Sequence, residues 1–126
     1  MSTLEAVVAE QLRLAAGTNG EVTGIGIDYE PWRESADLRT SRFFLRPTEQ
    51  AHATDARSLL RLWTVKEALF KATPDNGNAV LLDYEIAEPA SRSGWATGPR
   101  GDLMRYVSVE LDHGLLSVAL CRQGPG

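Results

Sequence analysis

The segment 56–72, ARSLLRLWTVKEALFKA, constrains the fold of this chain most strongly. At about 100° per residue, its apolar side chains cover one wide arc of a helix. The members of this arc are Leu59, Leu62, Trp63, Val65, Leu69, Phe70 and Ala72. Thr54 or Asp55 is suited to cap the helix, and Pro74 and Gly77 are suited to end it. The chain is therefore expected to pack one long helix against a second layer.

Three charged residues interrupt this helix. Lys66 falls inside the apolar arc, while Glu67 and Lys71 lie on its flank at the i,i+4 spacing that makes side chains neighbours. Two interpretations are open: lysines that extend their ammonium groups past apolar neighbours to water, or a functional site. Under the second interpretation, replacing Lys66 by Met leaves the free protein at least as stable, because a bound ligand is the partner of the ammonium.

The remaining elements follow from alternation and turn residues. Segment 22–30, VTGIGIDYE, alternates as a strand. Its two faces carry Thr23, Ile25, Ile27 and Tyr29 on one side and Gly24, Gly26, Asp28 and Glu30 on the other. Further predicted elements are a helix over 2–17 with a Ser2–Glu5 capping box, a turn over 17–21, a short helix around 43–52, strands within 78–88, 106–113 and 115–122, a loop over 88–102 and a hairpin turn at His113–Gly114. This order predicts an α+β fold in which an antiparallel sheet packs against a long helix. We expect one domain over 1–126, with an N-terminal helix in 1–17 and a core in 22–123.

Composition narrows the class of protein. With 126 residues, of which 43% are hydrophobic, the chain is long enough for one core. The net charge of −4 argues against general nucleic-acid binding. The sequence shows neither an 18-residue apolar run nor a secretory leader, and its single Cys121 cannot form an internal disulfide. We expect a cytoplasmic protein with a buried thiol and no membrane partner.

The charge is unevenly distributed along the chain. Segment 33–71 has eight basic and five acidic residues, a balance of +3, and the rest has five basic and twelve acidic residues, a balance of −7. An anionic ligand or an acidic partner is expected to approach the basic stretch. For any single arginine, an ordinary solvated position is an equally good explanation.

Asp28 and Glu30 lie two residues apart on one strand face, about 7 Å between α-carbons. Gly24 and Gly26 precede them on that face, and a strip without side chains allows a ligand to lie against the backbone. Hard oxygen ligands of this kind suit Mg²⁺. Alone, the pair is better explained by a solvated strand end, because such short patterns recur widely. With Glu67 as a third acid, and Lys66 and Lys71 as cations for a diphosphate, the set is typical of phosphoryl-type transfer.

Two motifs in this order resemble those of the 4′-phosphopantetheinyl transferases. GIGIDYE resembles the Gly-Ile/Val-Asp strand, and WTVKEALFKA resembles the Trp/Phe-x-x-Lys-Glu-Ala/Ser-x-x-Lys helix. RFFLRPTEQ is similar to the Phe-Phe…Glu segment that lies between them. The resemblance extends from about Val22 to Thr73, and it implies the fold of that family.

The resemblance implies transfer of the phosphopantetheine arm of coenzyme A to a serine of an acyl or peptidyl carrier protein, with release of 3′,5′-ADP. Asp28, Glu30 and Glu67 resemble the Mg²⁺ ligands, and Glu67 also resembles the residue that helps to deprotonate the serine. Lys66 and Lys71 resemble the lysines that hold the diphosphate, so Lys66 is expected to take part in catalysis. The pathway class implied is fatty acid or polyketide biosynthesis.

The chain also departs from the family pattern. The long, surfactin-activator type is a pseudo-dimer, and this chain is about one half of it, with motif wording nearer to its second half. Its length is nearer to the trimeric holo-acyl-carrier-protein synthase type, so a homo-oligomer is expected, a trimer rather than a dimer. No Ser-His-Ser segment is present, and His113 does not reproduce it. The alternative is a non-catalytic half-enzyme that binds coenzyme A or a carrier protein without transfer.

Overall fold

The computed structural model describes residues 3–16 and 22–122. Its elements are α1 (Thr3–Ala16), β1 (Val22–Pro31), the 3₁₀ helix η1 (Leu38–Phe43), α2 (Pro47–Gln50), α3 (Ala56–Ala72), the 3₁₀ helix η2 (Leu81–Asp83), β2 (Glu85–Ile86), β3 (Ser93–Thr97), β4 (Leu103–Glu110) and β5 (Gly114–Arg122). The predicted α+β class, with an antiparallel sheet and one long helix, is confirmed. The predicted Ser2 cap, the turn over 17–21 and position 123 lie outside the described residues.

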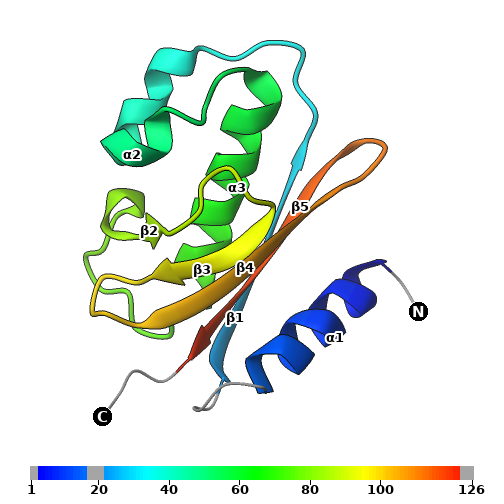
Figure 1. The fold of residues 1–126 in the computed structure, drawn as a ribbon, viewed down its shortest axis with the longest axis vertical. Coiled ribbons are helices and arrows are strands. Elements are labelled where there is room, and N and C mark those ends of the chain that lie inside the picture. The colour runs from blue at the N-terminus through cyan, green and yellow to red at the C-terminus, as the bar shows by residue number, and fades with distance from the viewer. Residues whose placement is uncertain (1–2, 17–21, 123–126) are drawn as a thin grey trace.

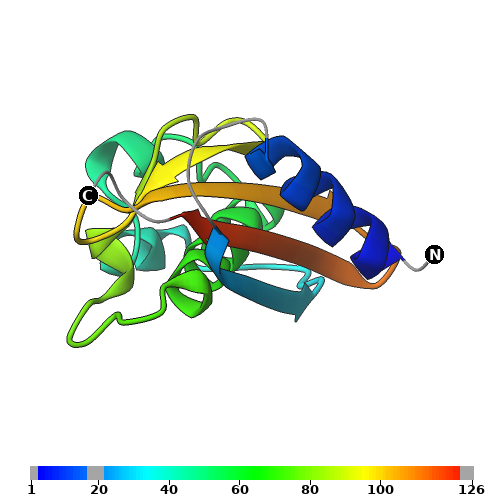
Figure 2. The same ribbon diagram turned by 90° about the horizontal axis from the view of Figure 1, so that it is seen from below.

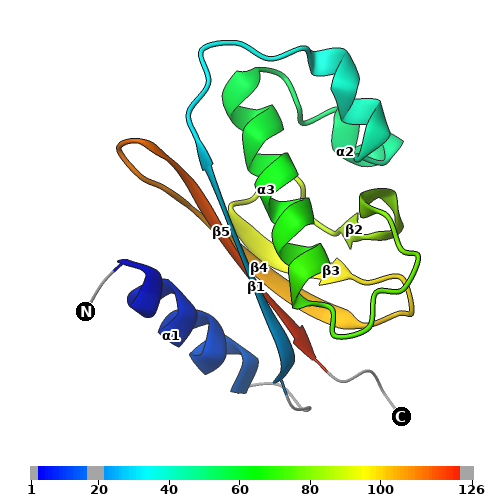
Figure 3. The ribbon, with the colours of Figure 1, turned by 180° about the vertical axis from the view of Figure 1, so that it is seen from behind.

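The sheet has five strands in the order β1-β5-β4-β3-β2. The C-terminal strand β5 lies between β1 and β4, and every pairing is antiparallel. Helix α3 packs on one face of the sheet and α1 on the other (Figures 1 and 3). Figure 2 shows α1 running along the face opposite to α3. Strand β1 therefore forms one edge of the sheet, directly under α3.

The core lies between α3 and the sheet. The apolar arc of the helix faces this core as predicted, with Trp63 and Phe70 partly buried, and it packs with side chains from the segment after η1, from η2 and from the inner face of the sheet. Tyr84, Met104, Tyr106, Ala119 and Cys121 are among the buried residues of this cluster. The buried thiol predicted for Cys121 is confirmed. Truncating one of the fully buried leucines of this layer costs about 2–5 kcal/mol, so this packing fixes where the helix lies.

The glycine strip of β1 faces α3 and not a ligand. A Cβ atom on Gly24 would lie 1.9 Å from the Ala72 carbonyl oxygen, and one on Gly26 would lie 2.0 Å from the Ala68 carbonyl oxygen. The prediction that this strip is open to a ligand is therefore wrong, because the helix backbone occupies the space. Glycine on the strand and alanine on the helix let the two backbones touch, and this contact sets the position of the residues beside it.

Helices α3 and α1 are each anchored by a polar side chain. The Asp55 carboxylate caps α3 by accepting a 2.8 Å hydrogen bond from the Ser58 amide, as the sequence predicted. Gln11 of α1 is buried and donates to the carbonyl oxygens of Arg105 and Val118, on β4 and β5, at 3.3 and 3.2 Å. Within residues 3–16 and 22–122, no helix combines the length and apolar character that crossing a membrane requires.

Two predictions in the last third need correction. Segment 78–88 is mostly irregular and 3₁₀ structure, with only Glu85–Ile86 in a strand, and the predicted loop over 88–102 contains strand β3. Strand β3 is stabilised by pairing with β4, and that long-range pairing leaves little trace in a segment rich in Gly, Pro and Ser. The predicted hairpin is confirmed, with the Leu111 amide donating to the Gly114 carbonyl oxygen at 2.8 Å.

Candidate functional site

The contact between β1 and α3 brings Asp28 of the strand beside Lys71 of the helix. The Lys71 ammonium donates to the Asp28 Oδ1 atom at 2.8 Å and to the Ile27 carbonyl oxygen at 3.4 Å. The Lys71 side chain is 48% exposed, whereas that of Asp28 is 9% exposed. The lysine thus reaches from solvent to a nearly buried carboxylate.

The second oxygen of Asp28 has no partner. Oδ2 is buried and accepts no hydrogen bond in the structure. Burial raises the pKa of Asp28, the hydrogen bond from Lys71 opposes this rise, and the Glu30 charge adds to it. A buried carboxylate oxygen without a partner is costly, and a cation beside it would remove that cost.

Glu67 lies on α3 next to Ala68, which contacts β1. The charges of Asp28 and Glu30 act on the Glu67 carboxylate. Burial is the main cause that raises its pKa, the Asp28 and Glu30 charges add to the rise, and Lys71 opposes it. Glu67 also lines a small hollow of 340 Å³, which we call the Glu67 recess. The other lining residues are Phe43, Phe44, Trp63, Phe70, Val80 and Leu81.

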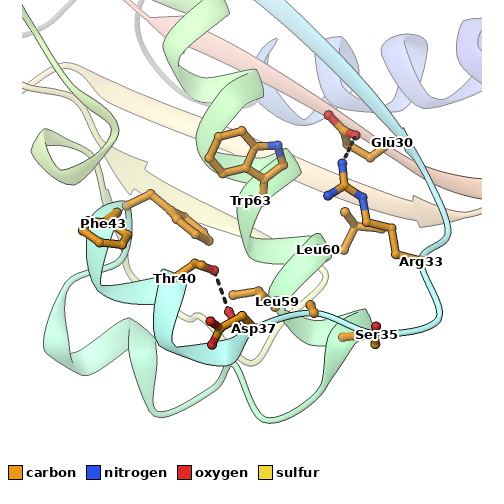
Figure 4. Close-up of a pocket in the computed structure, with 12 residues that line it drawn as sticks. Glu30, Arg33, Ser35, Asp37, Thr40, Phe43, Leu59, Leu60 and Trp63 are labelled. Carbon is orange, nitrogen blue, oxygen red and sulfur yellow. Dashed lines mark hydrogen bonds and ion pairs between the residues drawn. The ribbon is translucent and has the colours of Figure 1, made fainter.

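Glu30 lies at the far end of β1 and points to a second hollow. Its carboxylate is paired with Arg33 at 3.5 Å. Figure 4 shows the two side chains together at one side of a pocket of 440 Å³ that reaches Thr40 and Phe43 at the other. The two hollows share the wall made by Phe43, Phe44 and Trp63. Glu30 and Glu67 thus each line a hollow, and Trp63 lines both hollows.

Lys66 does not lie at this cluster. Its side chain is 0% exposed, and its ammonium is 2.8 Å from the Oε1 atom of Glu49, which is also 0% exposed. The ammonium also donates to the carbonyl oxygens of Tyr84 and Leu81. The expectation that a bound phosphate is the partner of Lys66 is corrected: its partner is a carboxylate of the same chain.

The acids fit a divalent cation in part. In the described ranges, no three His, Cys, Asp or Glu side chains gather closely enough to hold a metal ion by themselves. Mg²⁺, however, is commonly held by one or two carboxylates together with substrate phosphates and water. Asp28, with its unpartnered Oδ2, and Glu67 supply such hard oxygen donors. The Glu30 carboxylate is paired with Arg33, and it acts on Asp28 and Glu67 through its charge.

A protein-family model described as the 4′-phosphopantetheinyl transferase superfamily matches residues 24–121. The chain belongs to this superfamily. The match includes Asp28, Glu30, Glu67 and Lys71 and begins after α1. No curated protein matches the chain. The phosphopantetheinyl transferase superfamily comprises transferases that use coenzyme A as substrate and act on carrier proteins, and this membership supports a transferase function for the chain.

The sequence did not reveal the residues that support the site. Glu49 lies in the segment RFFLRPTEQ, three residues after Arg46, and its carboxylate accepts from the Arg46 amide at 2.7 Å. This is the glutamate half of a capping box, whereas the arginine side chain has no acceptor for the other half. That spacing was the available signal, but it gives no hint of Lys66. The role of Arg33 as the partner of Glu30 was missed as well.

Part of the predicted basic surface has structural roles. Arg61 donates to the carbonyl oxygens of Pro89 and Ser91 at 2.6 and 3.0 Å, and so holds the loop before β3. Arg57 lies over the Trp32 ring, 4.1 Å from its centroid. Because its guanidinium already binds two carbonyl oxygens of this chain, Arg61 is not available to bind an acidic partner protein.

Proposed function

We propose that this chain transfers 4′-phosphopantetheine from coenzyme A to a serine of an acyl or peptidyl carrier protein, with Mg²⁺ as cofactor and 3′,5′-ADP as product, as an enzyme of the holo-acyl-carrier-protein synthase type. One observation carries the proposal. At the contact of β1 with α3, a nearly buried Asp28 meets an exposed Lys71 and keeps one oxygen without a partner. Such a site is arranged to accept a cation and an anion together.

Asp28 and Glu67 are the residues that would hold Mg²⁺, and Glu30 would join them on release from Arg33. The ion would supply positive charge against the diphosphate of coenzyme A. The apolar hollows beside Glu30 and Glu67 suit a ligand that combines a charged diphosphate with an uncharged arm.

Lys71 is the lysine that we assign to the diphosphate. Its ammonium is at the surface and already lies beside Asp28, whereas Lys66 would have to leave Glu49 and two carbonyl oxygens to reach a ligand. Glu67 accepts the proton of the acceptor serine, in keeping with its raised pKa. The serine oxygen bonds to the phosphorus of the arm, and the bond from that phosphorus to the oxygen of the leaving 3′,5′-ADP breaks.

The carrier protein is expected to meet exposed arginines. Arg39, Arg42 and Arg57 are exposed and are sequence neighbours of residues that line the pocket of 440 Å³ beside Glu30. Carrier proteins of acidic surface would be attracted to them, with an effect mainly on the association rate.

A homo-oligomer, preferably a trimer, is part of the proposal. The outer face of edge strand β1 exposes Ile25, Ile27 and Tyr29 to solvent. A contiguous apolar surface of this kind is typical of a face covered by another chain. Light scattering of the purified protein tests this expectation, and a strict monomer with full activity would contradict it.

The deciding experiment incubates the protein with coenzyme A, Mg²⁺ and several apo carrier proteins, followed by intact-mass spectrometry. We expect a serine-linked phosphopantetheine on at least one carrier, and no product with EDTA or with Asp28→Asn. Calorimetric titration with coenzyme A separates the alternative: binding of coenzyme A without any transfer would favour a non-catalytic half-enzyme and overturn the proposal.

A further inference from the structure

The ion pair between Lys66 and Glu49 connects more than two residues. Glu49 Oε1 accepts from the Lys66 ammonium at 2.8 Å and from the Arg46 amide at 2.7 Å. Glu49 Oε2 accepts from the Ile86 amide at 2.7 Å. The carboxylate therefore joins the start of α2, helix α3 and strand β2 through three separate contacts.

Lys66 adds a fourth segment to this set of contacts. Its ammonium donates to the Tyr84 carbonyl oxygen and, at 3.3 Å, to the Leu81 carbonyl oxygen. Neither Lys66 nor Glu49 has a buried polar atom without a partner. Such full satisfaction is needed for a charge that is removed from water.

The connected segments include or adjoin the two walls of the Glu67 recess. One wall is Phe43 and Phe44, which precede α2, and the other is Val80 and Leu81, which precede Tyr84. Lys66, next to Glu67 on α3, is bonded to a member of the second wall and, through Glu49, to the segment that follows the first. The ion pair therefore lies where it can fix the spacing of both walls relative to Glu67.

We propose that Glu49 and Lys66 are positioning residues, which hold the two walls of the Glu67 recess at a fixed spacing and thereby place Glu67 for transfer. This inference rests on the proposed function. A well-packed apolar pair of similar volume often gives equal or greater stability than a buried ion pair. Directional hydrogen bonds to Arg46, Ile86, Tyr84 and Leu81 specify one arrangement of the walls, which an apolar pair does not.

The central test compares Lys66→Met, Glu49→Leu and the double variant. Each single variant leaves one buried charge, and we expect it to lower Tm by about 10 °C or more. The double variant should recover most of this loss. Its kcat with a carrier protein should nevertheless fall about tenfold or more, while KM for coenzyme A stays within about twofold, because Lys71 and Asp28 are untouched.

Hydrogen exchange gives a readout that does not depend on transfer. In the double variant, the amides of segment 80–84 should exchange at least about tenfold faster than in the parent, although global stability is similar. The matched control is the exposed pair Arg92–Glu110, 3.1 Å apart, changed to Met and Leu. It should leave Tm, exchange in 80–84 and kcat within error of the parent.

Glu49→Gln provides a second route if the double variant does not fold. It keeps the volume and an oxygen acceptor but loses the charge, and we expect a folded protein with faster exchange in 80–84 and at least about tenfold lower kcat. A folded double variant, or a folded Glu49→Gln, with parental exchange and parental kcat would overturn the inference. If the parent transfers nothing, the proposed function fails, and unchanged exchange in 80–84 would still refute the fixed walls.

Discussion

Helix α3 carries two lysine–carboxylate pairs of the same 2.8 Å length in very different surroundings. Lys66 and Glu49 are both fully buried, and every polar atom of the pair has a partner. Lys71 is half exposed, and its partner Asp28 keeps one buried oxygen without a hydrogen bond. We call Lys66–Glu49 the closed pair, because all its polar atoms are buried and have partners within the protein. We call Lys71–Asp28 the open pair, because the lysine is exposed and one carboxylate oxygen has no partner.

The difference shows how the same two residue types can serve structure in one place and chemistry in another. A buried charge must be satisfied within the protein, and a satisfied charge has nothing to offer a ligand. An exposed lysine beside an incompletely satisfied carboxylate can still exchange partners. The family motif contains both lysines, but in this structure Lys66 is buried against Glu49, whereas Lys71 lies at the surface, where we propose that it meets the substrate.

The largest effect is expected from breaking the closed pair. Lys66→Met should lower the free energy of unfolding by about 3–5 kcal/mol, because Glu49 is left as an unpaired buried charge. This is opposite in sign to the expectation from the sequence. The matched variant Lys71→Met should cost about 1 kcal/mol, since its ammonium is exposed and screened. Urea unfolding measures both values, and equal costs would contradict the contrast between the pairs.

The next largest effect is expected from removing the charge of Asp28, the carboxylate of the open pair. Asp28→Asn keeps the shape of the side chain and removes its charge, so transfer should fall by more than about a hundredfold, beyond the usual loss for residues that only orient a metal ligand. The fold should be at least as stable, because burial already disfavours the ionised form of Asp28. Single-turnover transfer followed by mass spectrometry, together with thermal unfolding, measures both. Near-parental transfer would remove Asp28 from the site.

A smaller effect is expected from removing Lys71, the lysine of the open pair. Lys71→Met should weaken coenzyme A binding or turnover by about 1.5–3 kcal/mol, which is the worth of a hydrogen bond to a charged group. Lys71→Arg keeps the charge and serves as the control, with a smaller loss. Calorimetric titration with coenzyme A decides the matter: parental affinity in Lys71→Met would show that the exposed lysine is not the one that meets the diphosphate.

The smallest effect is a dependence of stability on pH. The pKa values of Asp28 and Glu67 are raised in the folded protein, mainly by burial. The folded state then binds more protons than the unfolded state, so these groups reduce stability as pH rises from about 4, the ordinary carboxyl value, through the raised values. The difference in unfolding free energy, parent minus Asp28→Asn, should therefore fall as pH rises across this window. Urea unfolding at several pH values measures it, and a difference that stays constant or rises would contradict the raised pKa of Asp28.

Mg²⁺ should reverse this trend, because it binds the ionised carboxylates. The rise in Tm that Mg²⁺ gives should be larger at pH 7 than at pH 5 and smaller in Asp28→Asn. Thermal unfolding at both pH values, with and without the ion, provides the measurement. A Tm that is insensitive to Mg²⁺ at pH 7, even with coenzyme A present, would argue against the metal site.

The sequence by itself determined the features that depend on local periodicity. The apolar arc over 56–72, its Asp55 cap and the alternation of β1 each follow from residues a few positions apart. The face of β1 that carries Asp28 was therefore known before the structure, as was the burial of Cys121. The hairpin at 111–114 belongs to the same group.

The tertiary structure alone decided which element covers each face and which charges are paired. Periodicity marks Lys66 as buried but does not name Glu49, because their contact joins α3 to a distant segment. It marks Gly24 and Gly26 as a bare strip but does not reveal that α3 lies on it. Strand β3 exists because β4 pairs with it. Local pattern fixes the direction of a side chain, whereas its partner depends on how the whole chain packs, and that packing made one lysine structural and left the other at the surface.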